Sequence, residues 1–191
     1  MPIWLIIVLI LVILILIYTA VTYNGLVKGK NNVLEASSAI DVQLKRRNDL
    51  IPNLVETVKG YASHEKEVLE NITKARNLSQ TTLDNHADLG DKLAASDGLT
   101  NALGKLIAVS EAYPDLKANA NFSQLMDQLA ATEDKISYTR QLFNSTSANF
   151  NTSIQQFPAN IVAGAFKFAA FDLLKTDENE KTAPKVDFTH E

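Results

Sequence analysis

The first part of the chain is a single run of apolar side chains. Residues 3–22 (IWLIIVLILVILILIYTAVT) carry no charge, and the first charged side chain is Lys28. A helix of about 20 residues, at 1.5 Å per residue, spans roughly the 30 Å hydrocarbon core of a bilayer. Trp4 and Tyr23 lie near the two ends of the run, where aromatic side chains favour the membrane interface. The pattern predicts a transmembrane anchor formed by residues 1–23.

A buried core helix and a cleaved signal peptide are the alternatives for this segment. A soluble core helix does not need so long an uninterrupted apolar run. A signal peptide has a basic start, a shorter apolar stretch and small residues at its cleavage site. Residues 1–3 (MPI) bring no basic side chain, and residues 18–20 (YTA) place a tyrosine where a small residue belongs. We therefore expect an uncleaved anchor.

Beyond the anchor, apolar side chains recur with helical spacing. Two rows with a seven-residue repeat, offset by three, lie on one helix face: Leu26, Val33, Ile40, Arg47, Leu54, Tyr61, Val68 and Ala75, and Lys30, Ser37, Leu44, Ile51, Val58, Glu65 and Ile72. If continuous, a helix over residues 26–75 extends about 75–80 Å. Pro52 removes a backbone donor from it. Because the rows keep their phase across Pro52, a kinked continuous helix is predicted.

The rest of the chain predicts shorter helices. The pattern leaves the structure of the polar residues 79–97 undecided. A stripe over residues 99–113 predicts a helix that stops before Pro114. A third helix is predicted over residues 121–157, with Asn121 and Gln124 as a capping box and Pro158 at its end. Residues 161–171 predict a short fourth helix packed on the bundle, and residues 176–191 a flexible charged tail.

The predicted fold class is all-α. An N-terminal transmembrane helix (residues 1–23) is followed by an antiparallel bundle of three to four helices (residues 24–175), whose first helix is long and kinked at a proline. Arg47, Glu65 and Arg140 fall on rows that are otherwise apolar. They either reach the surface along their aliphatic stems or form a buried network, with an arginine paired to a carboxylate, that fixes the register of the helices.

The densest cluster of charges lies beside the proline of the first helix. It consists of Lys45, Arg46 and Arg47 with Asp49, three residues before Pro52. A solvated helix face is the simplest interpretation of these five residues. The functional interpretation is an interaction patch for a protein partner. Contact with anionic lipid head groups is a third, although the cluster lies some 30 Å beyond the membrane if the helix is straight.

Motifs for catalysis or cofactor binding are missing from the sequence. The absence of cysteine excludes disulfides and thiolate metal sites. His64-Glu65 begins like a zinc-protease motif, but residues 66–68 (KEV) lack the second histidine. His86 and His190 lie far from it, and no glycine-rich phosphate loop or nucleophile motif occurs. We expect no catalytic residue, no metal and no cofactor. A net charge of −4 also argues against a nucleic-acid binder.

Several stretches of the chain resemble the LemA family. They are residues 23–27 (YNGLV), 43–55 (QLKRRNDLIPNLV), 58–61 (VKGY) with His64-Glu65, 111–119 (EAYPDLKAN), 157–160 (FPAN) and 183–188 (APKVDF). The sequence departs from the family at Ser37, where a tryptophan is frequent, and at Lys135 and Phe143. The resemblance implies a membrane anchor and an antiparallel helical bundle. It brings no catalytic residues, because the family has no established biochemical activity.

Three functions fit this chain to different degrees. A protein-interaction or scaffold module at the cell membrane explains the anchor and the missing chemistry. A membrane-bound enzyme needs a polar pocket, which slender bundles rarely contain. A signalling accessory protein needs more than the few residues beyond the anchor.

The expected partners are membrane lipid, through the N-terminal helix, and a membrane or membrane-proximal protein; homo-oligomerisation stays open. Lys28 and Lys30 follow the span and the other flank has no basic residue, so the body is predicted to be cytoplasmic.

Overall fold

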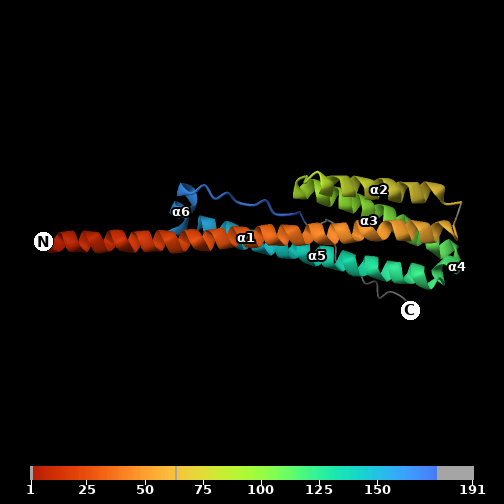
Figure 1. The fold of residues 1–191 in the computed structure, drawn as a ribbon, viewed down its shortest axis with the longest axis horizontal. Helices are drawn as coiled ribbons and strands as arrows, with labels where there is room; N and C mark the ends of the chain where they lie inside the picture. The colour runs from red at the N-terminus through yellow and green to blue at the C-terminus, as the bar shows by residue number, and fades with distance from the viewer. Residues whose placement is uncertain (1, 63, 176–191) are drawn as a thin grey trace, which may run out of the picture.

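The computed structural model describes residues 2–62 and 64–175, and this part of the chain is helical without any strand. The helices are α1 (Ile3–Lys59), α2 (Lys66–Asp84), α3 (Leu89–Ala112), α4 (Pro114–Lys117), α5 (Ala120–Gln155) and α6 (Ala159–Ala165). In Figure 1, α1 forms the long axis, α5 runs back along it, and the α2–α3 hairpin covers only its C-terminal half. The all-α prediction is confirmed. The predicted tail, residues 176–191, lies outside the described residues.

Helix α1 joins the apolar segment to the bundle without a break. Its most apolar window has a mean hydropathy of 3.2 and no buried residue, so this part is long and apolar enough to cross a membrane. Farther along, Val33, Ile40 and Leu44 are buried against α5. The predicted continuity through Pro52 is confirmed, since the proline lies inside the helix. One helix therefore serves both as the apolar segment and as the central rod of the bundle.

The backbone carbonyl freed by Pro52 has a replacement donor. A proline at position 52 cannot donate to the carbonyl of residue 48, four positions earlier. Arg76 of α2 donates from Nε to the Asn48 carbonyl oxygen at 3.3 Å instead. This contact compensates for the missing helix hydrogen bond and explains how an uninterrupted α1 accommodates the proline.

The predicted helix over residues 26–75 is wrong in its extent. Helix α1 ends at Lys59, followed by Gly60, and α2 returns antiparallel to it from Lys66. The apolar rows beyond the turn belong to α2, where Leu69 and Ile72 pack against Leu54 and Val58 of α1. Heptad spacing marks which face of a helix is apolar. Two helices folded against each other satisfy the same spacing as one long helix.

The polar region that the pattern left undecided is a helical hairpin. Helix α2 ends at Asp84, α3 begins at Leu89, and His86 in the turn has a φ of 50°. Leu83 and Leu93 pack into the core beside α1 and α5. The predicted stop before Pro114 is confirmed, because α3 ends at Ala112.

The N-terminal cap of α5 lies two residues earlier than predicted. The Asn119 side chain, not Asn121, accepts a hydrogen bond from the Phe122 backbone N–H at 2.9 Å. The apolar side chains of α5 that are buried recur with helical spacing, namely Phe122, Leu129, Ile136, Phe143 and Phe150. The helix comes close to α1 at Gly29. A Cβ on Gly29 would lie 3.1 Å from the Phe150 ring, so the glycine permits this approach. The predicted end near Pro158 is confirmed, since α5 stops at Gln155.

The C-terminal segment completes the bundle where α2 and α3 do not reach. The predicted helix over residues 161–171 is shorter and earlier, as α6 spans Ala159–Ala165 and non-helical chain follows. Asn151 of α5 bonds both the N–H and the carbonyl of Phe171, at 2.9 and 2.8 Å. Asn144 does the same for Leu174, at 2.8 and 3.0 Å. Asn144 and Asn151 are seven residues apart on a helix, which is about 10 Å along its axis. Phe171 and Leu174 are three residues apart, which is also about 10 Å in extended chain, so each asparagine meets one of them.

Candidate functional site

The predicted interaction patch does not form one surface. Lys45, Arg46, Asp49 and Pro52 are exposed, and Lys45 pairs with Asp49 one turn along at 3.3 Å. Arg47 is only 1% exposed and points into the bundle. Arg47 thus belongs to the interior, because it lies on the apolar face of α1. The proposal that the other four bind a partner stays a prediction.

The Arg47 guanidinium instead ties three helices together. It donates to Thr100 Oγ1 at 2.9 Å and to the Ser96 carbonyl at 2.9 Å, both on α3, and also to the Ser96 hydroxyl. Across the bundle it forms an ion pair with Glu133 of α5 at 2.8 Å. These bonds satisfy a charge that would otherwise be costly to bury. Two interpretations were given for the charged residues on the apolar rows, and for Arg47 the buried network is correct.

The other two charged residues on the apolar rows, Arg140 and Glu65, also have partners. Arg140 of α5 pairs with Asp97 of α3 at 3.2 Å. Glu65, at the turn before α2, accepts a hydrogen bond from the Tyr113 hydroxyl at 3.1 Å. This hydrogen bond is the main cause that raises the pKa of Tyr113, followed by burial and the negative charge of Glu65. The three positions therefore join elements distant in sequence.

A second set of polar contacts between helices was not predicted from the sequence. On α1, Asp41 accepts from Lys92 of α3 at 2.8 Å, and Asn48 donates to the Ser79 hydroxyl of α2 at 3.1 Å. Asp41, Asn48 and Val55 are spaced by seven, next to the apolar rows. That spacing was a usable signal, because polar residues beside a seam meet the neighbouring helix. The layer fixes how the α2–α3 hairpin is aligned on α1.

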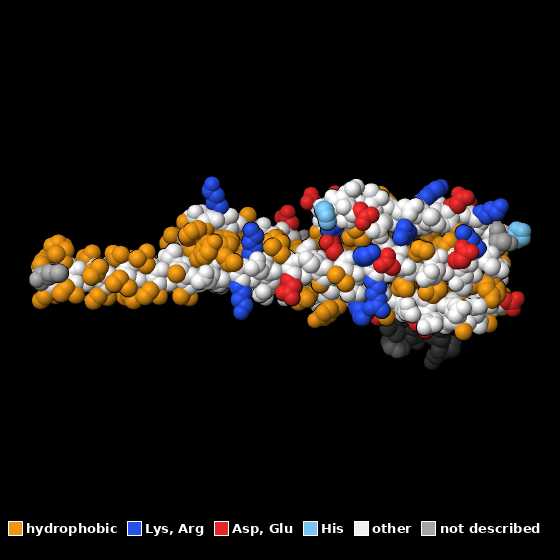
Figure 2. All heavy atoms as spheres, viewed as in Figure 1, with side chains coloured by type: hydrophobic (Ala, Val, Ile, Leu, Met, Phe, Trp, Pro, Cys, Tyr) orange, Lys and Arg blue, Asp and Glu red, His pale blue; other side chains and the backbone are white. Residues whose placement is uncertain are grey.

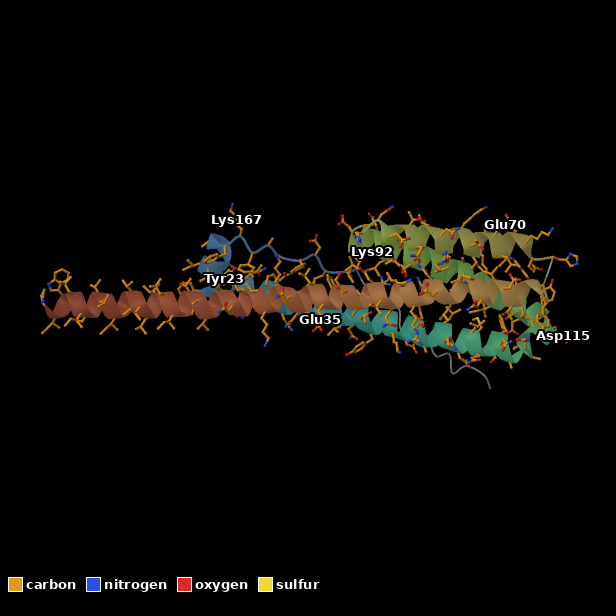
Figure 3. All side chains as sticks on the ribbon, viewed as in Figure 1. Tyr23, Glu35, Glu70, Lys92, Asp115 and Lys167 are labelled. Atoms are coloured by element: carbon orange, nitrogen blue, oxygen red, sulfur yellow. The ribbon has the colours of Figure 1, made fainter. Side chains whose placement is uncertain are left out.

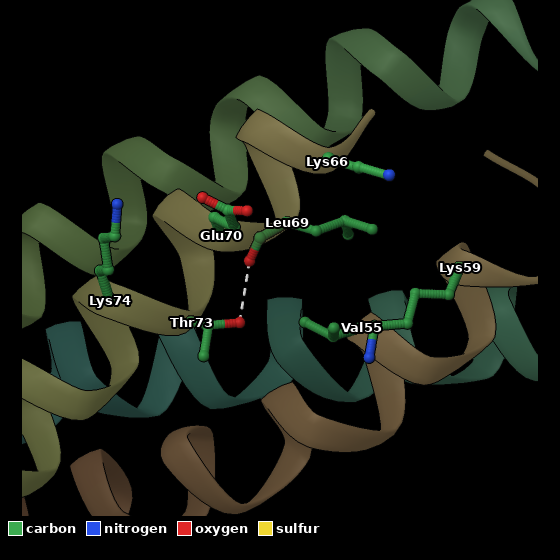
Figure 4. A pocket seen from close by; sticks show the side chains of 7 residues that line it. All are labelled: Val55, Lys59, Lys66, Leu69, Glu70, Thr73 and Lys74. Carbon is green, nitrogen blue, oxygen red and sulfur yellow. Dashed lines mark hydrogen bonds between the residues drawn. The ribbon is translucent and has the colours of Figure 1, made fainter. Parts of the chain in front are cut away.

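The best candidate for a binding site is a groove between α1 and α2, of about 550 Å³. Val55 of α1 and Leu69 of α2 form its apolar floor, and both are almost fully buried. Figure 4 shows the charged side chains arranged around this floor. The lining is completed by Lys59, Lys66, Glu70, Thr73 and Lys74. We call this feature the lysine groove.

Charge distinguishes the lysine groove from the molecule as a whole. Its rim has three lysines and one carboxylate, whereas the chain carries a net charge of −4. Lys66 and Lys74 are exposed, and Lys59 contacts Glu56 at 3.4 Å. The Thr73 hydroxyl donates to the Leu69 carbonyl at 2.8 Å, so it serves the helix backbone (Figure 4). An apolar floor with a basic rim fits an amphipathic, acidic ligand.

A second groove lies between α1 and α5. It is smaller, about 380 Å³, and its lining side chains are uncharged: Leu50, Asn53, Thr57, Asn121, Gln124, Leu125 and Gln128. In the described part of the chain, no three His, Asp or Glu side chains gather closely enough to hold a metal ion. The lysine groove is therefore the site with the most distinctive chemistry.

Known proteins resemble this chain over most of its length. A family model described as "LemA family" matches residues 36–188. Protein LemA of Metamycoplasma hominis is 30% identical, over 83% of this chain and 71% of that protein. Magnetosome protein MamQ of Magnetospirillum gryphiswaldense is 26% identical, and MamQ 2 of Paramagnetospirillum magneticum 27%. For both, the match covers 74% of this chain and 60% of the relative's length.

The region that the family model matches contains the helical bundle. It begins at Ala36, where α1 already lies in the bundle, and takes in α2, α3, α4, α5 and α6. It includes the buried Arg47 and Asn48, as well as the residues of the lysine groove. Because the family model covers well over half of the sequence and a relative is 30% identical over most of both chains, the family is established. This protein belongs to the LemA family.

Proposed function

We propose that this protein is an interaction module of the cell membrane, which the first part of α1 spans once while the bundle binds a protein partner. The observation that carries the proposal is the continuity of α1 from an entirely exposed apolar segment into the bundle core. Exposed Leu, Ile and Val side chains on a lone helix are unfavourable in water and suited to lipid. The same rigid helix then fixes the position of the bundle above the membrane.

The distance from the membrane favours a protein ligand for the lysine groove. From residue 23 to Lys59, α1 rises roughly 55 Å at 1.5 Å per residue. Exposed charges are screened beyond about 8–10 Å at physiological ionic strength. Lipid head groups at the base of α1 therefore contribute little at the groove. We propose that an acidic amphipathic segment of a partner protein lies in the lysine groove.

The proposed role is one of binding without catalysis. The buried charged groups of the bundle are engaged in pairs between helices, such as Arg47 with Glu133 and Lys92 with Asp41. Such pairs align helices, and the charged groups that line the lysine groove are exposed lysines and one exposed carboxylate, Glu70. The lysine groove offers an apolar floor and ammonium groups, which are means of recognition.

The groove can be tested by photo-crosslinking in living cells. A photoreactive amino acid in place of Glu70, on the groove rim, should give adducts with a discrete partner, mapped to an acidic amphipathic segment. Lys66→Glu with Lys74→Glu should abolish them. Lys105→Glu with Lys135→Glu is the matched control, because both lysines are exposed and lie on other helices. Equal loss of adducts in both double variants, or persistence of adducts in the groove variant, would rule out the lysine groove as the docking site.

The membrane arrangement is tested separately. We propose that the body faces the cytoplasm, as the lysines after the span suggest. Since the chain has no cysteine, a single cysteine at Val42, which is exposed, can be labelled selectively. In intact cells it should resist a membrane-impermeant maleimide and react after permeabilisation. Labelling in intact cells would reverse the orientation, and full recovery of the chain in the soluble fraction would refute the anchor.

A further inference from the structure

At the end of the bundle nearest the apolar segment, the last part of α5 and all of α6 carry no charge, whereas α1 carries Lys28 and Lys30. In α1 the first charged residue is Lys28, and between Arg140 and Lys167 the sequence has none. Because α5 runs back along α1, with Phe150 against Gly29, the charge-free stretch that follows Arg140 reaches Leu26 at the start of the bundle (Figure 1). Figure 2 shows hydrophobic side chains continuing from the apolar segment onto the region of α6.

Helix α6 lies at the level where α1 would leave the membrane. Val162 and Ala163 are buried against Leu26. The Phe166 ring lies 4.7 Å from the ring of Tyr23, centroid to centroid. Tyr23 directly follows the predicted span of residues 3–22, and Figure 3 shows it next to α6. At 1.5 Å per residue, Tyr23 to Leu26 occupies about the first 5 Å outside the hydrocarbon core.

The outer side of α6 and its flanking turns is apolar and exposed. Phe157 is 81% exposed, Ile161 64% and Phe166 52%. Val21, on the neighbouring turn of α1, is exposed as well. A contiguous group of large exposed apolar side chains marks a contact site in a soluble protein or a membrane surface. In Figure 2 the hydrophobic surface of this region continues into the apolar segment of α1. Lys28, Lys30 and Lys167, which are near these residues in sequence, are exposed as well.

We propose that α6, with Phe157, Ile161 and Phe166, enters the interfacial layer of the same leaflet and forms a second lipid contact. This inference rests on the proposed membrane anchor. Aromatic and aliphatic side chains favour this layer, and lysines at the same depth can reach lipid phosphates. Two contacts, from α1 and α6, fix the tilt and rotation of the bundle, which a single helix would leave free. The orientation of the lysine groove relative to the membrane plane follows from this geometry.

Spin labelling of the full chain in lipid vesicles tests the second contact. The absence of cysteine allows Phe157→Cys and Ile161→Cys to be labelled one at a time. Val12→Cys, in the apolar segment, is the lipid reference, and Tyr138→Cys, 65% exposed on α5, is the aqueous reference. In vesicles of phosphatidylcholine and phosphatidylglycerol, labels at 157 and 161 should collide several-fold more with oxygen than with an aqueous nickel chelate, as at Val12. The label at Tyr138 should show the opposite preference.

Each outcome separates this inference from the proposed anchor. If Val12 reports lipid while 157 and 161 report water like Tyr138, the second contact is refuted and the anchor stands. If Val12 also reports water, the anchor fails and the second contact fails with it. If 157 and 161 are shielded from both reagents, and their spin–spin broadening disappears on dilution with unlabelled chain, a second copy covers α6 and the lipid contact is overturned.

Discussion

Replacing Arg47 measures how the buried network stabilises the bundle. Arg47 is 1% exposed and donates to α3 and α5, while its carboxylate partner Glu133 is 46% exposed. Arg47→Ala removes the charge, the hydrogen bonds and most of the side-chain volume. Losing these hydrogen bonds and leaving a cavity in place of a large buried side chain should lower the free energy of unfolding by roughly 3–5 kcal/mol.

Arg47→Met should cost less, because it keeps most of the volume. The groups it leaves behind are Glu133 and Thr100, which reach water, and the Ser96 carbonyl, which still accepts from Thr100 Oγ1 at 3.3 Å. Only the Ser96 hydroxyl, 1% exposed, is left buried without this donor. One such buried polar group costs about 1–3 kcal/mol. The two replacements of Arg47 should therefore differ by about 2 kcal/mol.

Glu133→Gln isolates the contribution of the ion pair. It leaves a hydrogen-bond acceptor near Arg47 but removes the counter-charge from a buried guanidinium. We expect a loss of about 1.5–3 kcal/mol in the natural background and nearly none beside Arg47→Met. Urea unfolding of the full chain in mild detergent, followed by helical ellipticity, gives both values if the slopes with urea agree.

Two results would contradict this account of Arg47. Equal destabilisation by Arg47→Ala and Arg47→Met would mean that filling the space contributes nothing. An equal effect of Glu133→Gln in both backgrounds would mean that the two charges are not coupled.

Three further predictions concern contacts between distant elements. Arg76→Met should destabilise the bundle by about 1 kcal/mol, because the Asn48 carbonyl loses its donor. In a Pro52→Ala background the same change should cost almost nothing, since the restored backbone N–H of residue 52 can bond that carbonyl. Urea unfolding of the four proteins measures both losses, and an equal loss in both backgrounds contradicts the prediction. Asn144→Leu with Asn151→Leu should speed amide hydrogen exchange at Phe171 and Leu174 well above that in α3, since their N–H groups lose their acceptors; unchanged protection would mean that packing alone holds the segment. Because hydrogen bonding to Glu65 raises the pKa of Tyr113 above its ordinary value of 10.0, stability from this contact is full below about pH 10 and lost as pH rises through the folded pKa. Glu65→Gln should therefore lower the pKa of Tyr113 in an NMR titration of ring-labelled tyrosine, and an unchanged pKa would refute the assigned cause.

Local patterns in the sequence identified most of the helical regions and the helix ends that are marked by a proline. The apolar run identified the segment that can cross a membrane, because its length and composition are properties of one continuous stretch. Pro114 and Pro158 marked helix ends, since a proline constrains the residues next to it wherever it stands. The apolar rows showed which face of α1 and α5 would be buried. Even the family resemblance could be recognised from short runs of residues.

Only the tertiary structure decided how these helices meet. Helical spacing is the same for one rod and for two rods folded together, so the turn after Lys59 was invisible to it. The chain alone could not tell whether Arg47 faced solvent or Glu133, because the two are 86 residues apart in sequence. The lysine groove was missed for the same reason, as its floor and rim come from both α1 and α2. Periodicity reports which face of a helix is apolar; burial and charge pairing depend on which other helix covers that face.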